Sequence, residues 1–143
     1  DLDESIADIL DAAFDKHAPV IVAYVDADGA PHVSFRGTVQ GHGTDTIAMW
    51  IRDAGGGLLR AIETNPQLAL LYRDDTRTQY EFTGRAQRAD GTEERSEIYD
   101  RSPVFERGLD PARRGVALII EVDSVRGGAP GSEIHQRRAP AGS

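Results

Sequence analysis

The segment Trp50-Ile51-Arg52-Asp53-Ala54-Gly55-Gly56-Gly57-Leu58 joins an apolar strand to a helix through three consecutive glycines. Glycine lets the backbone approach a ligand closely, and the free N–H groups of a first helical turn attract negative charge. Arg52 and Arg60 flank the loop on its two sides. The junction therefore predicts an anion-binding corner, although the same residues also fit a glycine-rich connector with solvated arginines.

Composition limits the classes of function that this chain can have. It has 143 residues, a net charge of −8 and no cysteine, which suits one domain without disulfides, thiolate metal sites or a catalytic thiol. The acidic balance without a basic stripe argues against a nucleic-acid partner. The chain lacks an apolar run of membrane-spanning length, and its acidic start is unlike a signal peptide. We expect a cytoplasmic protein with no membrane partner.

On the N-terminal side of the glycine loop, the spacing predicts an amphipathic helix over residues 2–17 and a strand over 20–25. Turn residues 26–29 then lead into a second strand from about Ala30 to Gln40, which makes a hairpin. In that second strand apolar and polar side chains alternate. We expect its apolar set to face the core and its polar set to face water; the members are Val33, Phe35, Gly37 and Val39 against His32, Ser34, Arg36, Thr38 and Gln40.

On the C-terminal side, strands are predicted over residues 47–51, 67–73, 79–87 and 116–125, with a helix over 58–64. Thr92 begins another helix, and Ser102-Pro103 and Asp110-Pro111 indicate two further helix starts. About six strands linked mostly as hairpins favour a mainly-β antiparallel barrel with peripheral helices, because closure removes exposed strand edges. We place this domain at residues 1–126, and expect residues 127–143 to form a tail that is mobile or packed on a partner.

Several short motifs occur in a recognisable order. They are the hairpin Asp28-Gly29-Ala30-Pro31, the helix end Asn65-Pro66 and the strand Thr78-Gln79-Tyr80-Glu81-Phe82-Thr83-Gly84-Arg85. Over residues 18–126 the chain resembles the pyridoxamine-phosphate-oxidase-like family of FMN-binding split barrels. The resemblance implies a six-stranded antiparallel split barrel that forms a homodimer, with two equivalent flavin sites along the interface, each drawing on both chains.

The resemblance also implies where flavin contacts fall. Family contacts on the strand after the hairpin match Ser34, Phe35, Arg36 and Gly37, and those ending the next strand match Trp50 and Ile51. Others match the loop and helix start at Gly56, Gly57 and Leu58, and Gln79, which stands five residues before Gly84. Trp50 has two interpretations, as a wall for the flavin ring or as a core or interface residue.

The chain departs from the family at the phosphate-binding positions. Flavin oxidases carry basic residues where Ser34, Gly56 and Gly57 stand here. Each lost charged hydrogen bond weakens binding by roughly 1.5–3 kcal/mol, so replacements are required. Arg36, Arg52 and Arg60 can supply them, helped by the loop amides, and Arg52 beside the loop is the principal candidate.

These residues favour an FMN-dependent oxidoreductase that moves a hydride between a nicotinamide-type donor and an unknown small molecule. No acid–base dyad or metal site is expected from the histidines, since His17, His42 and His135 are scattered and His32 begins a water-facing row. Pyridoxamine phosphate oxidation would need further basic residues, of which residues 124–138 offer only Arg126, Arg137 and Arg138. The alternative is a non-enzymatic barrel dimer that binds haem, flavin or deazaflavin for sensing or storage, or one without a cofactor.

Overall fold

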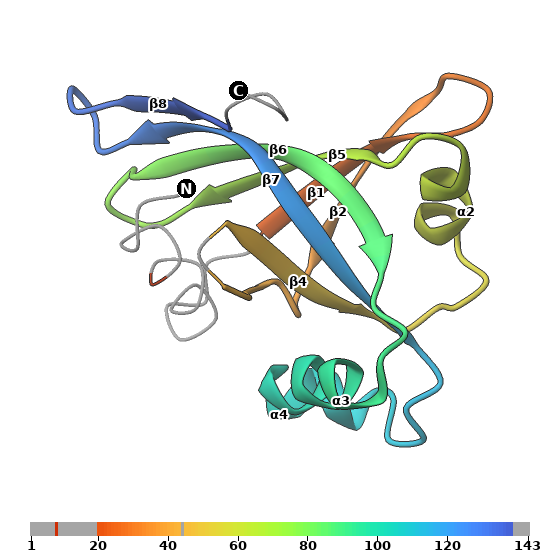
Figure 1. Ribbon diagram of the computed structural model, residues 1–143. Coiled ribbons are helices and arrows are strands. Elements are labelled where there is room, and N and C mark those ends of the chain that lie inside the picture. The colour runs from red at the N-terminus through yellow and green to blue at the C-terminus, as the bar shows by residue number, and fades with distance from the viewer. Residues whose placement is uncertain (1–7, 9–19, 44, 139–143) are drawn as a thin grey trace.

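One antiparallel sheet dominates the structure, a computed structural model that describes residues 8, 20–43 and 45–138. Its eight strands are β1 (Val20–Val25), β2 (Pro31–Arg36), β3 (Gln40–Gly41), β4 (Thr46–Ile51), β5 (Gln67–Arg73), β6 (Gln79–Arg88), β7 (Val116–Gly128) and β8 (Ile134–Arg137). The helices described are α2 (Gly57–Thr64), α3 (Thr92–Arg101) and α4 (Val104–Gly108) (Figure 1). The mainly-β antiparallel class is confirmed, and the strands beyond the predicted set are the short β3 and β8. The helix predicted over 2–17 lies outside the described residues, apart from Asp8.

A short connection makes the sheet curl. Its strand order is β2-β1-β5-β6-β7-β4-β3, with β8 also paired to β7. In a flat sheet the two edge strands would lie about 29 Å apart, six spacings of about 4.8 Å. The chain nevertheless passes from Arg36 at the end of β2 to Gln40 at the start of β3 through only residues 37–39, a path of at most about 14 Å. The edges must therefore approach one another, and the sheet forms a half-barrel.

The inside of the curl is the main core, and α3 covers a smaller second core. β4 serves both, because Ile47, Met49 and Ile51 face the main core while Ala48 and Trp50 face the second. On β6 the predicted alternation is confirmed, with Phe82 fully buried and Ala86 7% exposed. A Cβ added at Gly84 would overlap the backbone carbonyl of Glu121 on β7, at the point where the β6–β7 register shifts. The strand pattern therefore places its small residue at a point where β6 and β7 approach closely.

Strand β2 has the opposite facing from the one predicted. Val33 and Phe35 are 72% and 67% exposed, so the expectation that they face the core is wrong. Ser34 and Arg36 lie opposite Val22 and Val20 of β1, both fully buried valines. Because paired residues of antiparallel strands point to the same side of a sheet, Ser34 and Arg36 point inward. The pairing with β1, set by the hairpin turn, decides the facing of this edge strand.

The helix predicted at Asp110-Pro111 is also absent from the structure; residues there form a turn in which Arg113 has a φ of 55°. The Asp110 carboxylate accepts hydrogen bonds from the backbone N–H groups of Arg114 and Gly115, at 3.0 and 2.9 Å. Local bonding of this kind by an aspartate competes with helix formation. The segment is consequently held as a tight loop beneath β4.

The sheet continues past residue 126, where the sequence places the end of the barrel domain. β7 runs on to Gly128, and β8 returns along it with Arg126 opposite His135. Gly127 has a φ of 139°, and a Cβ there would overlap the carbonyl of Gln79. The end of β7 and β8 pair through their backbones and have no apolar pattern. Because sequence reasoning relies on that pattern, it did not predict them.

Candidate functional site

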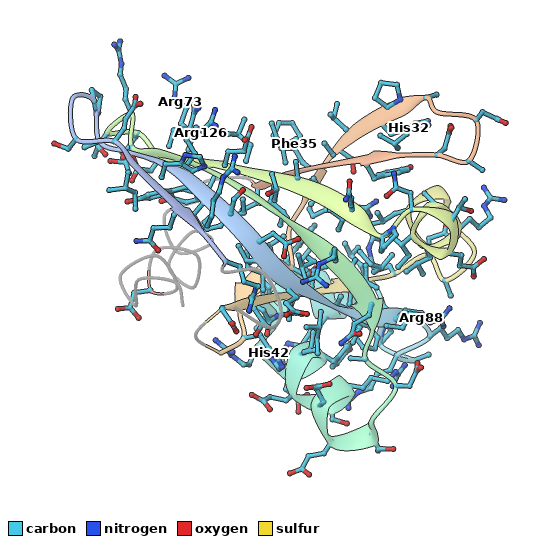
Figure 2. All side chains as sticks on the ribbon, turned by 45° about the horizontal axis from the view of Figure 1, so that its top comes forward. His32, Phe35, His42, Arg73, Arg88 and Arg126 are labelled. Atoms are coloured by element: carbon cyan, nitrogen blue, oxygen red, sulfur yellow. The ribbon has the colours of Figure 1, made fainter. Side chains whose placement is uncertain are left out.

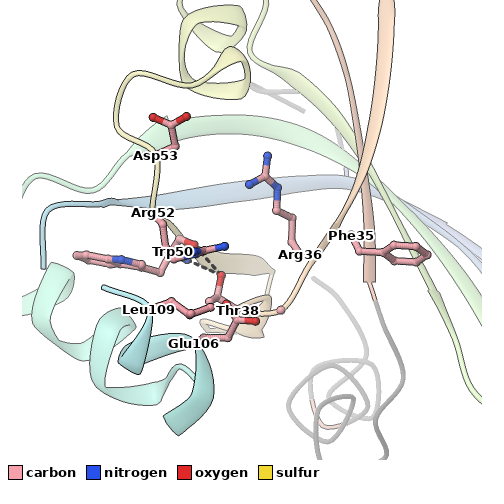
Figure 3. A pocket seen from close by; sticks show the side chains of 9 residues that line it. Phe35, Arg36, Thr38, Trp50, Arg52, Asp53, Glu106 and Leu109 are labelled. Atoms are coloured by element: carbon pink, nitrogen blue, oxygen red, sulfur yellow. Dashed lines mark hydrogen bonds between the residues drawn. The ribbon is translucent and has the colours of Figure 1, made fainter. Parts of the chain in front are cut away.

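A cavity of about 450 Å³ opens where β2 ends, between the loop after β4 and helix α4. Its lining comes from three distant parts of the chain: residues 35–38; Trp50, Arg52 and Asp53; and Glu106 and Leu109. Five of the residues that sequence reasoning assigned to the cofactor line it: Phe35, Arg36, Gly37, Trp50 and Arg52. Figure 3 shows Arg36 reaching from β2 toward the loop that carries Asp53, while Phe35 points away on the other side of the strand.

The inward face of β2 carries buried polar atoms without partners. Ser34 Oγ and Arg36 Nε are both buried, and neither has a hydrogen-bond partner among the described residues. Buried polar atoms are normally paired, and the exceptions cluster where a ligand, ion or water completes the site. These two atoms lie two residues apart on one face of the strand. The face therefore offers an unsatisfied hydroxyl and an unsatisfied guanidinium N–H to a ligand.

Two guanidinium groups share this cavity. Burial lowers the pKa of Arg36, and the positive charge of Arg52 lowers it further, while Tyr24 and Asp53 act in the opposite direction. Within the described residues, neither Arg36 nor Arg52 has an ion pair closer than 4.0 Å. An anion between the two groups would relieve both the repulsion and the burial cost.

The glycine loop is partly filled by an acidic side chain of its own. Asp53 Oδ1 accepts a hydrogen bond from Gly55 N at 3.1 Å, and the Asp53 carbonyl accepts one from Gly56 N at 3.0 Å. Helix α2 starts after Gly56 with no side-chain cap and no acidic residue in its first turn. The loop thus presents the amides at the helix start to a ligand, with a carboxylate beside them.

A second cavity, of about 310 Å³, lies on the same face of β2 beneath α2. It takes in Gly57 and Arg60 together with Tyr24 and His32, whose rings stack with centroids 5.0 Å apart. His32 Nε2 lies 2.7 Å from Asp26 Oδ2, and this hydrogen bond is the main cause that lowers the pKa of Asp26. His32 therefore belongs to the hairpin, and Arg60 lies in a different cavity from Arg36 and Arg52.

Trp50 is held by the second core. Its side chain is 3% exposed, its ring meets Tyr99 edge-on at 5.0 Å, and Arg95 lies 4.7 Å above it. Its Nε1 donates to Asp110 Oδ2 at 2.9 Å. The Trp50 ring therefore packs as a core residue, the second of its two interpretations, although part of its surface still lines the cavity.

The remaining predicted residues lie in three places. Ile51 and Leu58 are each 2% exposed and pack in the main core, so only their backbone atoms can face a ligand. Gly57 packs against the Tyr24 hydroxyl, which a Cβ would meet at 2.9 Å. Gln79 is exposed at the opposite end of the sheet, opposite Gly128, and its own chain does not bring it to the cavity.

Besides Thr38, which adjoins the predicted contacts on Ser34 to Gly37, sequence reasoning missed three residues of the cavity. Glu106 and Leu109 come from α4 and the residue after it, and no pattern in the sequence links that segment to β2. A Cβ at Gly37 would overlap the Glu106 carboxylate, so the two segments meet closely. Asp53 had a signal, because an aspartate two residues before a glycine often closes a turn onto the backbone.

Two negative observations apply to the part of the chain that the structure describes. Within residues 8, 20–43 and 45–138, no three His, Asp or Glu side chains are grouped as for a metal ion. Over the same residues, the helices are all too short or too polar to cross a membrane.

A family model for pyridoxamine 5'-phosphate oxidase matches residues 6–125. The chain belongs to this family. Membership in the pyridoxamine 5'-phosphate oxidase family confirms the resemblance carried by the hairpin, the Asn65-Pro66 helix end and the strand after Thr78. No curated protein matches the chain.

Solved structures share the fold at low sequence identity. HupZ from Group A Streptococcus has a TM-score of 0.69 at 19% identity, covering 90% of this chain and 98% of that one. A Clostridium acetobutylicum protein related to general stress protein 26, of the pyridoxinephosphate oxidase family, has a TM-score of 0.70 at 11% identity, covering 95% and 96%. A heme binding protein from Mycobacterium smegmatis has a TM-score of 0.70 at 15% identity, and the match covers 92% of this chain and 57% of that one. These likenesses establish the split-barrel fold.

The hydrogen bonds of Asp110 generate a prediction about stability. Asp110→Ala leaves the buried N–H groups of Trp50 and Gly115 without an acceptor, which costs roughly 1–3 kcal/mol for each group. We expect the free energy of unfolding at neutral pH, measured by urea denaturation, to fall by about 2–4 kcal/mol. Glu97→Ala, on the exposed side of α3, is the control and should change it little.

The same bonds predict a pH dependence. Burial pushes the pKa of Asp110 up, but its hydrogen bonds to Arg114, Trp50 and Gly115 and the charge of Arg95 outweigh burial, so the pKa lies below the ordinary value of 3.8. A carboxyl with a lowered folded-state pKa stabilises the fold above its unfolded pKa, and this is lost as the pH falls through the folded value. The stability gap between wild type and Asp110→Ala should narrow below about pH 4. A constant gap down to pH 2.5 would contradict the assignment.

Proposed function

We propose that this chain forms a homodimer that binds FMN, with the phosphate held at the cavity between Arg36 and Arg52. With the flavin bound, the dimer acts as an oxidoreductase between a nicotinamide-type donor and a small molecule. The observation that supports this most is the buried Nε of Arg36, which has no partner and lies on the face of β2 that leads to the cavity. Family membership supports a flavin cofactor. The phosphate of FMN is an anion that could pair with the two arginines of the cavity.

The physical argument rests on the cost of an unpaired cation. A guanidinium that loses water without gaining a partner is destabilising, whereas hydrogen bonds between charged groups contribute roughly 1.5–3 kcal/mol each. Arg36 and Arg52 present planar forks, which suit the oxygens of a phosphate. Ser34, on the inward face two residues before Arg36, adds a hydroxyl. Arg36 thus takes over the charge that relatives place at the position of Ser34.

This arrangement changes which arginine we expect to contribute most to phosphate binding. The sequence favours Arg52, because it borders the glycine loop. Arg52 is exposed to solvent, however, whereas Arg36 is partly buried. Water therefore screens the attraction between Arg36 and a bound anion less strongly. Arg60 lines the neighbouring cavity and would act at longer range. We therefore assign the main phosphate contact to Arg36, with Arg52 closing the site.

When bound, the flavin supplies the hydride chemistry, and the chain supplies binding and orientation. Gly37, just after β2, lets the Glu106 side chain of α4 approach closely beside the cavity. The uncapped start of α2 favours negative charge near the neighbouring cavity. Phe35 and Leu109, which are 67% and 44% exposed, give the cavity an apolar rim. An anionic ligand with a large planar apolar part fits such a lining.

The first test compares Arg36→Ala with wild type in calorimetric titration of FMN. Losing one charged contact of 1.5–3 kcal/mol should raise the Kd by about 10- to 100-fold. Arg52→Ala should raise it less, because that side chain is exposed. The control is Arg88→Ala, at the C-terminal end of β6 and outside the cavity lining, where the side chain is 46% exposed and, among the described residues, forms an ion pair with Asp90 at 4.0 Å. Equal affinities for Arg36→Ala and Arg88→Ala would remove the assignment.

The second test uses Asp53, whose negative charge opposes an anion in the same cavity. Asp53→Asn keeps an oxygen for the Gly55 N–H but removes the charge. We expect FMN to bind several-fold more tightly to this variant, measured by fluorescence quenching during titration. Asp75→Asn, in the exposed turn after β5, should leave the affinity unchanged. Weaker binding by Asp53→Asn would mean that the carboxylate positions the arginines instead.

A second candidate is a non-enzymatic dimer that binds haem or a deazaflavin for sensing or storage. It is favoured by the shared fold of the heme binding protein from Mycobacterium smegmatis, at a TM-score of 0.70. Absorption spectra separate the candidates, because protein purified with FMN shows the two visible flavin bands and protein purified with haem shows a Soret band. We expect the flavin spectrum. A Soret band together with failure to bind added FMN would replace the first proposal with the second.

A further inference from the structure

The cavity beneath α2 contains a histidine–aspartate pair that the proposed flavin site does not use. His32 Nε2 lies 2.7 Å from Asp26 Oδ2, and Asp26 Oδ1 accepts hydrogen bonds from the backbone N–H groups of Asp28 and Ala30, each at 2.9 Å. These bonds lower the pKa of Asp26, with the His32 bond as the largest cause, so the carboxyl is ionised at neutral pH. Figure 2 labels His32 on the β1–β2 hairpin, next to helix α2.

The pair leaves one nitrogen of the His32 ring for a ligand. An ionised carboxylate can only accept hydrogen bonds, so Nε2 carries the hydrogen of the bond to Asp26, and the neutral ring has its lone pair on Nδ1. Nδ1 makes no hydrogen bond among the described residues. Histidine side chains take up a proton between about pH 5 and 8, and Nδ1 then becomes a charged donor. An anion that meets Nδ1 therefore binds together with a proton.

The walls of this cavity suit a small flat ligand. The rings of Tyr24 and His32 stack at an interplanar angle of 13°, with their centroids 5.0 Å apart. Three further residues of the lining, Ala27, Gly57 and Ala61, have a methyl group or no side chain at all. The volume of about 310 Å³ is at the lower end of the range for ligand cavities. The space therefore fits a single aromatic ring that carries one small polar group.

Arg60 adds a cation to the same lining. It is exposed, and its guanidinium forms no ion pair closer than 4.0 Å with the residues that the structure describes. Glu63, the other charged residue of α2, does not line the cavity. A guanidinium fork binds a carboxylate through two parallel hydrogen bonds. Arg60 can therefore hold a carboxylate at the edge of the cavity.

The charges of the lining favour a ligand with a single negative charge. Asp26 and Asp28 contribute two negative charges and Arg60 one positive charge, so the formal charge is −1 with neutral His32 and zero with protonated His32. The phenol of Tyr24 is the remaining titratable group of the lining. A carboxylate adds one negative charge, whereas a phosphate group adds about two at neutral pH. The balance of charges thus suits a carboxylate better than a phosphate.

We propose that this cavity is a second ligand site, for a small aromatic carboxylic acid. The ligand ring packs against Tyr24 and the small residues of the lining. The carboxylate pairs with Arg60 and with His32, whose ring takes up a proton as the ligand binds. The site is separate from the cavity of Arg36 and Arg52, and it does not depend on a flavin.

The test is calorimetric titration of the protein as purified with benzoate, in two buffers of different ionisation enthalpy. The difference between the two heats gives the number of protons taken up, which should approach one per benzoate above the usual titration range of histidine. Because a proton is taken up, a rise from about pH 7.5 to 8.5 should raise the Kd by about tenfold. Benzamide, which has the same shape without the charge, should bind more weakly and without proton uptake.

Two variants assign the effect to the two side chains. His32→Gln keeps a polar side chain that cannot take up a proton, so its Kd for benzoate at about pH 6 should rise by about tenfold or more, and its pH dependence should disappear. Arg60→Gln should weaken binding by a similar factor while the proton uptake stays near one. The matched control is His135→Gln, which is exposed on β8 and lies outside both cavities. Circular dichroism verifies that each variant is folded.

Several outcomes would overturn the proposal. They are equal affinity of wild type and His32→Gln for benzoate, benzoate binding without proton uptake, and no shift of the His32 ring signals when benzoate is titrated in NMR experiments. Stronger binding of inorganic phosphate than of benzoate, followed by the same ring signals, would also overturn the assignment to a carboxylate.

Arg36→Ala separates this site from the proposed flavin site. Its affinity for benzoate should equal that of wild type, because Arg36 lines the other cavity. Loss of benzoate binding in Arg36→Ala would place the carboxylate in the first cavity and overturn the second site. Since no flavin is added, failure of the protein to bind FMN is a separate result that leaves these outcomes unchanged.

Discussion

Residues 37–39 connect the two edge strands of the sheet, and the rest of the structure depends on this short connection. Because β2 and β3 lie at opposite ends of the strand order, three residues can join them only if the sheet curls. The curl encloses the main core and brings the end of β2 close to the loop after β4. Arg36 and Arg52, which belong to different strands and loops, come to share one cavity for this reason.

The same geometry turns the polar side of β2 inward. Ser34 and Arg36 lie opposite fully buried valines, and each has a buried atom without a partner. Such an arrangement costs stability, and proteins commonly accept this cost where a ligand completes the bonding. The apolar residues Val33 and Phe35 are correspondingly left outside. One reversal of facing thus produces both an inward row of unpaired polar atoms and an apolar outer patch.

The two sides of β2 therefore differ in character. Its inward side brings Arg36 to the cavity, and its outward side begins a face that runs from apolar residues to Arg126 and His135 on β7 and β8. Trp50 has a structural part in this, because its bond to Asp110 holds the turn behind α4 that closes the cavity.

The amino-acid sequence determined the strands β1, β2 and β4 to β7, helices α2 and α3, the family, and the residues around Arg36 and Arg52, because alternation, turn chemistry and glycine spacing are local. Tertiary structure decided what local patterns leave open. An alternating strand does not reveal which face meets the core, so the facing of β2 came from its pairing with β1. Glu106 and Leu109 joined the cavity, and Trp50 joined the second core, through contacts between segments far apart in the chain. Gln79 and Arg126 lie away from the cavity because the long β6–β7 pair carries them to the opposite end of the sheet.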